Sequence, residues 1–136
     1  MKVRLSQLHL LIALPIIALL LTACEGNINH QWHIENNGNQ AIAITADRVW
    51  EGDVFTTTIG PATSATISIV YTRGGSSTPQ PPSFAFNSLL VIDNNGDTLL
   101  RNTLDLNSWT TETEQTGRAP SSYTHNHILV VLESDF

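Results

Sequence analysis

The stretch Leu89-Leu90-Val91-Ile92-Asp93-Asn94-Asn95-Gly96-Asp97 decides what kind of fold this chain forms. Its four consecutive apolar residues are typical of a strand that is covered on both faces. The polar residues behind them predict a tight hairpin turn, because Asn95-Gly96 accepts the positive φ angles of such turns. We expect a return strand from Thr98 to about Leu106. The stretch therefore indicates antiparallel β structure.

Segments with a period of two lie on both sides of this hairpin, and no sustained helical stripe interrupts them. Turn residues such as Asn, Gly and Pro bound these segments. The strands expected besides the hairpin are 32–35, 42–46, 54–59, 65–71 and 127–133. In residues 65–71 we expect Ile67, Ile69 and Tyr71 to share one face, with Thr66 and Ser68 on the other. The apolar run at 127–133 is typical of a central strand.

The number and spacing of these strands predict one all-β domain over residues 32–136, with about seven short strands. We expect an immunoglobulin-like antiparallel β-sandwich with Greek-key connections. The chain has no pair of cysteines like the one that links the sheets of antibody domains, so this resemblance concerns architecture only. A small β-barrel is the alternative.

The charge of the chain excludes one large class of partner. After Cys24 there are four arginines, no lysine and all twelve acidic residues, a formal balance of −8. A protein with this charge offers no basic surface to a phosphate backbone, so we expect no nucleic-acid partner. Cys24 is also the only cysteine, so the fold cannot contain an internal disulfide.

The first 24 residues have the parts of an export signal. Lys2 and Arg4 precede an apolar run at 10–21, which ends in Leu21-Thr22-Ala23-Cys24. This ending resembles the lipobox of bacterial lipoproteins. The resemblance implies that residues 1–23 are a signal peptide, that Cys24 carries a lipid, and that residues 24–31 are a short tether. An uncleaved transmembrane anchor is the alternative, but the run is short for one and contains Pro15.

The lipobox resemblance also implies a location. A lipid on Cys24 would hold the domain at a membrane of the cell envelope, with no polybasic segment to assist it. Residue 25 is Glu, whereas Asp directly after the cysteine tends to retain such lipoproteins at the inner membrane. We therefore expect the outer membrane rather than the inner one.

Four histidines follow the signal, and they are the candidate metal ligands: His30, His33, His125 and His127. If the first and last strands pair, all four gather at one end of the domain. His125 and His127 share a face of a strand, as a zinc site requires of neighbouring ligands, but His30 and His33 face opposite ways if the strand already includes residue 30. The alternative is that they are surface residues at strand ends.

The sequence shows no catalytic motif. There is no nucleophile elbow, no zinc-protease motif and no phosphate-binding loop, so we expect no enzyme activity and no cofactor. Residues 73–83 predict an exposed loop, in which Pro79, Pro81 and Pro82 favour an extended conformation suited to docking on a partner. A tolerated surface insertion is the alternative.

These observations predict a membrane-anchored envelope lipoprotein with a small β-sandwich. We expect it to act as a non-enzymatic binding, adhesion or assembly module whose partner is an envelope protein or a glycan. The alternative function is a metal- or small-ligand-binding lipoprotein that uses the four histidines.

Overall fold

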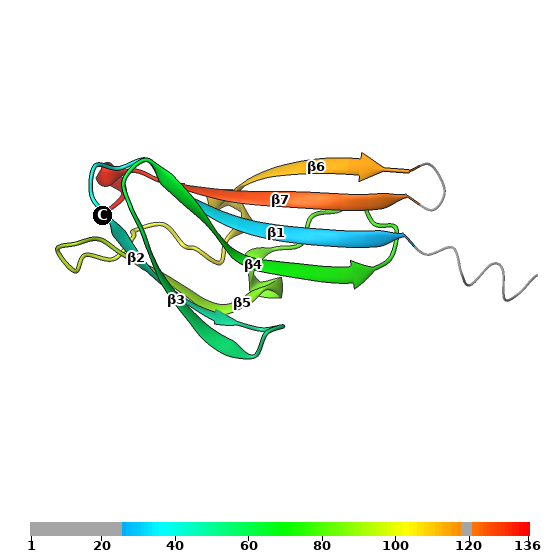
Figure 1. The fold of residues 1–136 in the computed structure, drawn as a ribbon, viewed down its shortest axis with the longest axis horizontal. Helices are drawn as coiled ribbons and strands as arrows, with labels where there is room; N and C mark the ends of the chain where they lie inside the picture. Colours follow the sequence, from blue (N-terminus) through cyan, green and yellow to red (C-terminus); the bar gives the residue numbers. More distant parts are fainter. Residues whose placement is uncertain (1–25, 118–120) are drawn as a thin grey trace, which may run out of the picture.

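The computed structural model describes residues 26–117 and 121–136, and these residues form strands joined by loops and short 3-10 helices (Figure 1). The expected signal peptide, residues 1–23, and Cys24 lie outside the described residues. The strands are β1 (Asn27–Asn36), β2 (Ile42–Arg48), β3 (Asp53–Ile59), β4 (Thr63–Arg73), β5 (Phe86–Ile92), β6 (Thr110–Thr116) and β7 (Ser122–Val131). The 3-10 helices are η1 (Pro82–Phe84), η2 (Leu106–Ser108) and η3 (Glu133–Asp135). None of the described helices is long and apolar enough to cross a membrane.

The seven strands form two sheets, which confirms the predicted all-β sandwich. The larger sheet has the order β4-β1-β7-β6 and the smaller one the order β3-β2-β5. The two sheets do not join into a closed ring, so the barrel alternative is wrong. β1 and β7 pair in parallel, whereas every other strand pair is antiparallel. The strand order differs from that of constant immunoglobulin domains, so the resemblance is one of architecture.

The core lies between the sheets and is centred on Trp32, which is fully buried. The indole of Trp32 meets the rings of Phe86 and Trp109 edge-on, with centroids 5.7 Å and 5.2 Å apart. Alternate residues of β1, β2, β5 and β7 complete the core, as the period of two predicts. Each large apolar side chain that is fully buried contributes about 1.5–3 kcal/mol, so this cluster is the main stabilising element.

A β-bulge in β4 changes which of its residues face the core. Trp32 and His33 of β1 pair with Ser68 and Thr66, which leaves Ile67 as the extra residue. The bulge reverses the alternation, because a shift of one residue moves the following side chains to the opposite face. Ile67 is buried as expected, but Ile69 and Tyr71 are 42% and 71% exposed. The predicted common face of these three residues is therefore wrong beyond the bulge.

The turn after β5 is confirmed, but the strand expected to follow it is not. The carboxylate of Asp93 accepts hydrogen bonds from the backbone N–H groups of Asn95 and Asp97, and Gly96 has a φ of 90°. Beyond the turn only the single bridge between Ile92 and Thr98 continues the pairing. The chain then runs as a loop along the open edge of β5, where the Thr103 hydroxyl donates to the carbonyl of Leu89 at 2.6 Å.

β1 and β7 begin several residues earlier than expected, and both extend the same end of the larger sheet. β1 begins at Asn27, so the predicted tether 24–31 is wrong from residue 27 onward. β7 begins at Ser122 rather than at His127. As a result the larger sheet reaches beyond the smaller one, on the right of Figure 1. We call this part of the larger sheet the overhang. It contains the start of β1 from Asn27, the start of β7 from Ser122 and the end of β4 at Arg73.

Candidate functional site

Three histidines gather on the inner face of the overhang. His30 pairs with His125, and Trp32 pairs with His127, across the parallel β1–β7 contact. Because alternate residues of a strand share a face, all four side chains point inward. His30, His125 and His127 are at most 1% exposed. The alternative interpretation, that the histidines are surface residues at strand ends, is therefore wrong for these three. We call His30, His125 and His127 the histidine column.

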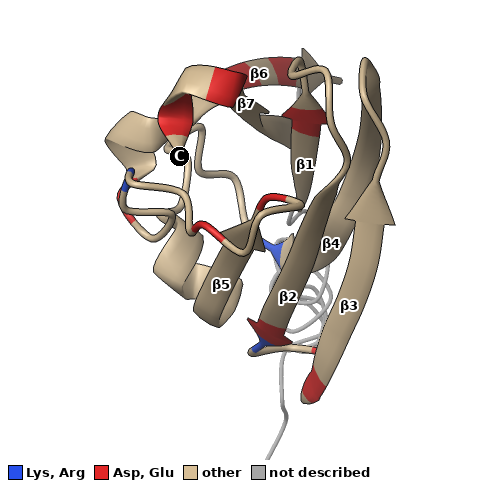
Figure 2. Cartoon of the chain, turned by 90° about the vertical axis from the view of Figure 1, so that its left-hand side faces the viewer, with Lys and Arg blue, Asp and Glu red and all other residues tan. Residues whose placement is uncertain are grey.

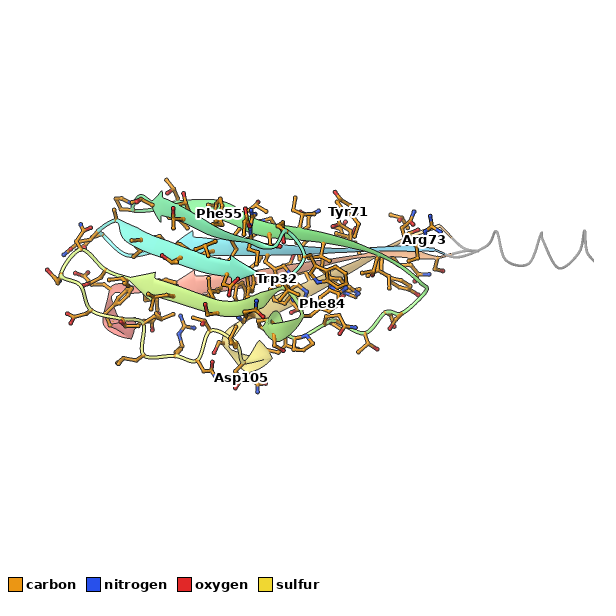
Figure 3. All side chains as sticks on the ribbon, turned by 90° about the horizontal axis from the view of Figure 1, so that it is seen from below. Trp32, Phe55, Tyr71, Arg73, Phe84 and Asp105 are labelled. Atoms are coloured by element: carbon orange, nitrogen blue, oxygen red, sulfur yellow. The ribbon has the colours of Figure 1, made fainter. Side chains whose placement is uncertain are left out.

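The rings of the column are stacked on one another and on neighbouring aromatic rings (Figure 3 shows the central position of Trp32 and Phe84). The His30 ring lies 4.9 Å from that of His125 and 5.7 Å from that of His127, with interplanar angles of 22° and 14°. His127 also stacks on Trp32 at 3.7 Å. The ring of Phe84, from η1, lies 5.3 Å from His30 and closes the column on the loop side.

Hydroxyl groups from β6 orient two of the imidazoles. Nδ1 of His127 is hydrogen-bonded to the Thr111 hydroxyl at 2.9 Å, and Nδ1 of His125 to the Thr113 hydroxyl at 2.8 Å. Nδ1 of His30 lies 3.4 Å from Nε2 of His127. Nε2 of His125 is buried and has no hydrogen-bond partner among the described residues. The column therefore has few groups that could stabilise a positive charge.

Burial keeps the column neutral at pH 7. Burial, together with the neighbouring His125, lowers the pKa of His30 to about 4. Burial, together with the other histidines, lowers the pKa of His127 to about 3. The pKa of His125 is lowered for the same reason, although the backbone of Ser76 counters part of the effect. No carboxylate is among the causes of these shifts.

The structure brings together three of the four predicted metal ligands and leaves His33 apart. His33 lies on the outer face of β1, where its Nδ1 is hydrogen-bonded to the Thr66 hydroxyl at 2.9 Å. In residues 26–117 and 121–136 no group of three or more His, Cys, Asp or Glu side chains is placed to hold a metal ion. The three buried rings face one another in a stack, whereas ligand nitrogens must converge on one point in the planes of their rings.

The proline-containing loop folds back over the column instead of projecting from the domain. Gly74 donates to the carbonyl of Gly26 at 2.9 Å where the loop begins. The loop then returns along the overhang to η1, where Pro82 is buried. Pro79 is half-buried and Pro81 exposed, so the idea of three presented prolines is wrong for Pro82. We call residues 74–84 the roof segment.

A polar pocket lies at the opposite end of the sandwich, where the turn after β5, the β1–β2 loop and the C-terminal residues meet (Figure 2 views this end). It has a volume of about 210 Å³. Its lining combines amide and carboxylate side chains with three apolar ones, and contains no Lys or Arg: Asn36, Gly38, Asn39, Gln40, Ile42, Asp93, Asn95, Asp97, Leu132, Glu133 and Phe136. The sequence does not predict this pocket, because its walls come from three segments that are distant along the chain.

Asn36 fixes the wall of the polar pocket. This side chain is 1% exposed, and its amide donates to the carbonyls of Gln40, Ile59 and Gly60 at 2.7, 3.1 and 3.1 Å. The carboxylates of Asp97 and Glu133, in contrast, have no hydrogen-bond or ion-pair partner among the described residues. They are therefore free to accept hydrogen bonds from a ligand.

Comparisons with known proteins do not add a relative to these observations. No protein-family model matches the chain, and neither a curated protein nor a solved structure is matched by it.

Proposed function

We propose that this chain is a lipid-anchored, non-enzymatic binding module of a bacterial envelope, and that it recognises a glycan in the polar pocket. The observation that carries the proposal is the position of the pocket relative to the expected anchor. Two residues, Glu25 and Gly26, separate Cys24 from the start of β1. β1 then runs for 10 residues to Asn36 in the pocket wall, a distance of about 30 Å. The pocket therefore faces away from the anchored end.

The lining of the pocket suits a saccharide. Sugar hydroxyls donate hydrogen bonds to carboxylates such as Asp97 and Glu133, and they exchange hydrogen bonds with amides such as Asn39. The less polar face of a sugar ring packs on apolar side chains, which Leu132 and Phe136 supply. A volume of about 210 Å³ matches one sugar unit rather than a large cofactor. The absence of basic groups in the lining disfavours phosphorylated or strongly acidic glycans.

The short connection to the expected anchor would hold the domain close to the lipid surface, and Glu25 after the cysteine favours the outer membrane. Because β1 begins at Asn27, little chain remains to act as a spacer. The overhang and the roof segment lie at this anchored end, and the pocket at the far end. An envelope glycan on the far side from the lipid would reach the pocket without obstruction.

Calorimetric titration of the chain from Glu25 onward, which contains every described strand, tests the glycan proposal. The probes are uncharged saccharides: N-acetylglucosamine and its short oligomers. We expect Asp97→Asn and Glu133→Gln to weaken binding at least tenfold. Glu112→Gln and Glu114→Gln make the same change on exposed β6 and serve as matched controls.

Two results would contradict the proposal. Equal loss of binding in the pocket variants and the β6 controls would show a general charge effect. No heat of binding with any of these saccharides at millimolar concentration would remove the glycan from the pocket altogether.

A further inference from the structure

We propose that the histidine column and the roof segment form an acid-operated latch, in which protonation of the column releases the roof segment while the two sheets stay together. The proposal concerns the overhang and is independent of the polar pocket. It follows from how the column is covered, from the groups that surround it and from its burial.

The column is covered by a loop and not by the opposite sheet. At the overhang the smaller sheet has ended, and the inner face of β1 and β7 meets the roof segment (Figure 1). Few contacts fasten the roof segment. Gly74 donates to the carbonyl of Gly26 at one end, the backbone of Ser76 lies against His125, the Phe84 ring packs on His30, and the Trp50 indole N–H donates to the carbonyl of Phe84 at 2.8 Å. Phe84 also packs against the apolar core, whose buried members come mainly from the paired strands of the two sheets.

The groups that face the column are almost all neutral. From β6 they are the hydroxyls of Thr111 and Thr113, from β7 the phenol of Tyr123, and from η1 the ring of Phe84. β4 places Val70 opposite His30.

Charged and titratable groups around the column offer it no counter-ion. Glu51 is bonded to the Ser68 hydroxyl, beside Trp32 in the sheet register, and lies 3.5 Å from Arg48. His33 lies on the outer face of the sheet and lowers the pKa of His127. A proton on the column therefore has no acidic partner among the described residues that face it.

Protonation and closure of the roof segment therefore oppose each other. An imidazole in water takes up a proton near its ordinary pKa of 6.5, whereas the covered His30 and His127 do so only near 4 and 3. Between these limits the open state binds more protons than the closed state, so a fall in pH favours opening. Each proton that is taken up on opening increases the equilibrium constant of opening by up to about tenfold for every pH unit that the pH falls. Three histidines together therefore increase it by up to about a thousandfold per pH unit.

The latch opens locally because the roof segment is the least firmly held cover of the column. Releasing it removes the backbone of Ser76 from His125 and gives water access to this ring. Removing a strand from the column would instead break the continuous β1–β7 ladder, which runs from Ile28 to Asn36. Local opening is thus the less costly route to hydration of the charged rings.

Hydrogen exchange by NMR on the chain from Glu25 onward tests the proposal between pH 7 and pH 4.5, with rates corrected for the intrinsic effect of pH. The roof is reported by the amides of Gly74 and Phe84, which donate to the carbonyls of Gly26 and Pro81. The core is reported by the amides of β2, the central strand of the smaller sheet. We expect roof protection to fall at least 100-fold between these pH values and to stay at least 100-fold below β2 protection throughout, because the roof segment opens while the sheets stay paired.

Variants separate the latch from general acid sensitivity. Combined His30→Gln, His125→Gln and His127→Gln is expected to make roof protection independent of pH, whereas His33→Gln is expected to leave it as in the unmodified chain. If the triple variant does not fold, direct NMR titration of the imidazoles in the unmodified chain decides in its place. Column pKa values above 6, unchanged roof protection at pH 4.5, or roof protection equal to β2 protection would each overturn the proposal.

Discussion

The indole of Trp32 and the imidazole of His127 lie flat against each other, with centroids 3.7 Å apart and planes 10° apart. Both side chains are completely buried, so the stack joins the apolar core to the histidine column. His127→Ala is expected to lower the free energy of unfolding by about 2–4 kcal/mol, because it leaves a cavity beside the indole and removes the stacking. Urea denaturation measures the loss. His33→Ala, on the outer face, is the control and should cost less than about 1 kcal/mol.

Ala62 adopts a φ of 53°, in the left-handed region that residues with a Cβ atom avoid. Replacing it by glycine relieves this strain, and the gain exceeds the entropic cost of glycine in the unfolded chain. Ala62→Gly is therefore expected to stabilise the fold by about 0.5–1 kcal/mol, measured as a rise in Tm. Ala65→Gly, in β4, should lower Tm. A lower Tm for both variants would contradict the strain at Ala62.

The side-chain amide of Asn36 donates hydrogen bonds to three carbonyl groups of neighbouring segments, and its oxygen accepts a hydrogen bond from the N–H of Gly38. Asn36→Ala leaves buried polar groups without partners and should cost about 2–4 kcal/mol in unfolding free energy. It should also loosen the wall of the polar pocket. Asn39→Ala, at an exposed position of the same loop, is the control for stability and should change it by less than about 0.5 kcal/mol. Equal effects of the two substitutions would show that the bonds of Asn36 contribute little.

The free energy of unfolding should fall as the pH drops below about 6.5. The pKa values of His30 and His127 are lowered to about 4 and about 3, so the unfolded chain binds more protons than the folded one in this range. Each of these histidines removes up to about 1.4 kcal/mol per pH unit, and the stabilisation is fully present only above the unfolded pKa. Urea midpoints at pH 7, 5.5 and 4.5 measure the slope, and a midpoint that rises over this range would contradict neutral burial.

The proposed anchor depends on one sulfur atom. Cys24→Ser removes the acceptor of the lipid, so the protein should leave the membrane fraction or retain its signal. Membrane fractionation and the mass of the mature chain measure the result. Glu25→Gln keeps the cysteine and should fractionate normally. Normal processing and membrane attachment of Cys24→Ser would contradict the lipobox interpretation.

Periodicity predicted the parts of the fold that follow from one strand at a time. The alternation of Ile42, Ile44 and Ala46 with smaller or polar residues is that of a strand with one buried face, and β2 has this pattern. The turn at Asp93 was predictable for the same reason, since its hydrogen bonds lie within five residues.

Features that depend on two distant segments were not predictable. The bulge at Ile67 arises from the register between β4 and β1, which no local pattern records. The polar residues 27–31 suggest a tether when they are considered alone. They form a strand because they pair with β4 and β7, which lie far away in the sequence. The burial of His30 was not predictable for the same reason, because this polar residue is covered by residues that are distant along the chain. The polar pocket was missed because three separate turns form it.

The parallel contact between β1 and β7 also determines the order in which the molecule is completed. β1 lies between β4 and β7, the last of the seven strands, so one of its edges stays unpaired until nearly all of these strands have been made. Contacts of such long sequence separation form slowly, and an unpaired edge invites association with other chains. Truncation within β7 would therefore leave an edge of β1 open to pairing with a strand of another molecule.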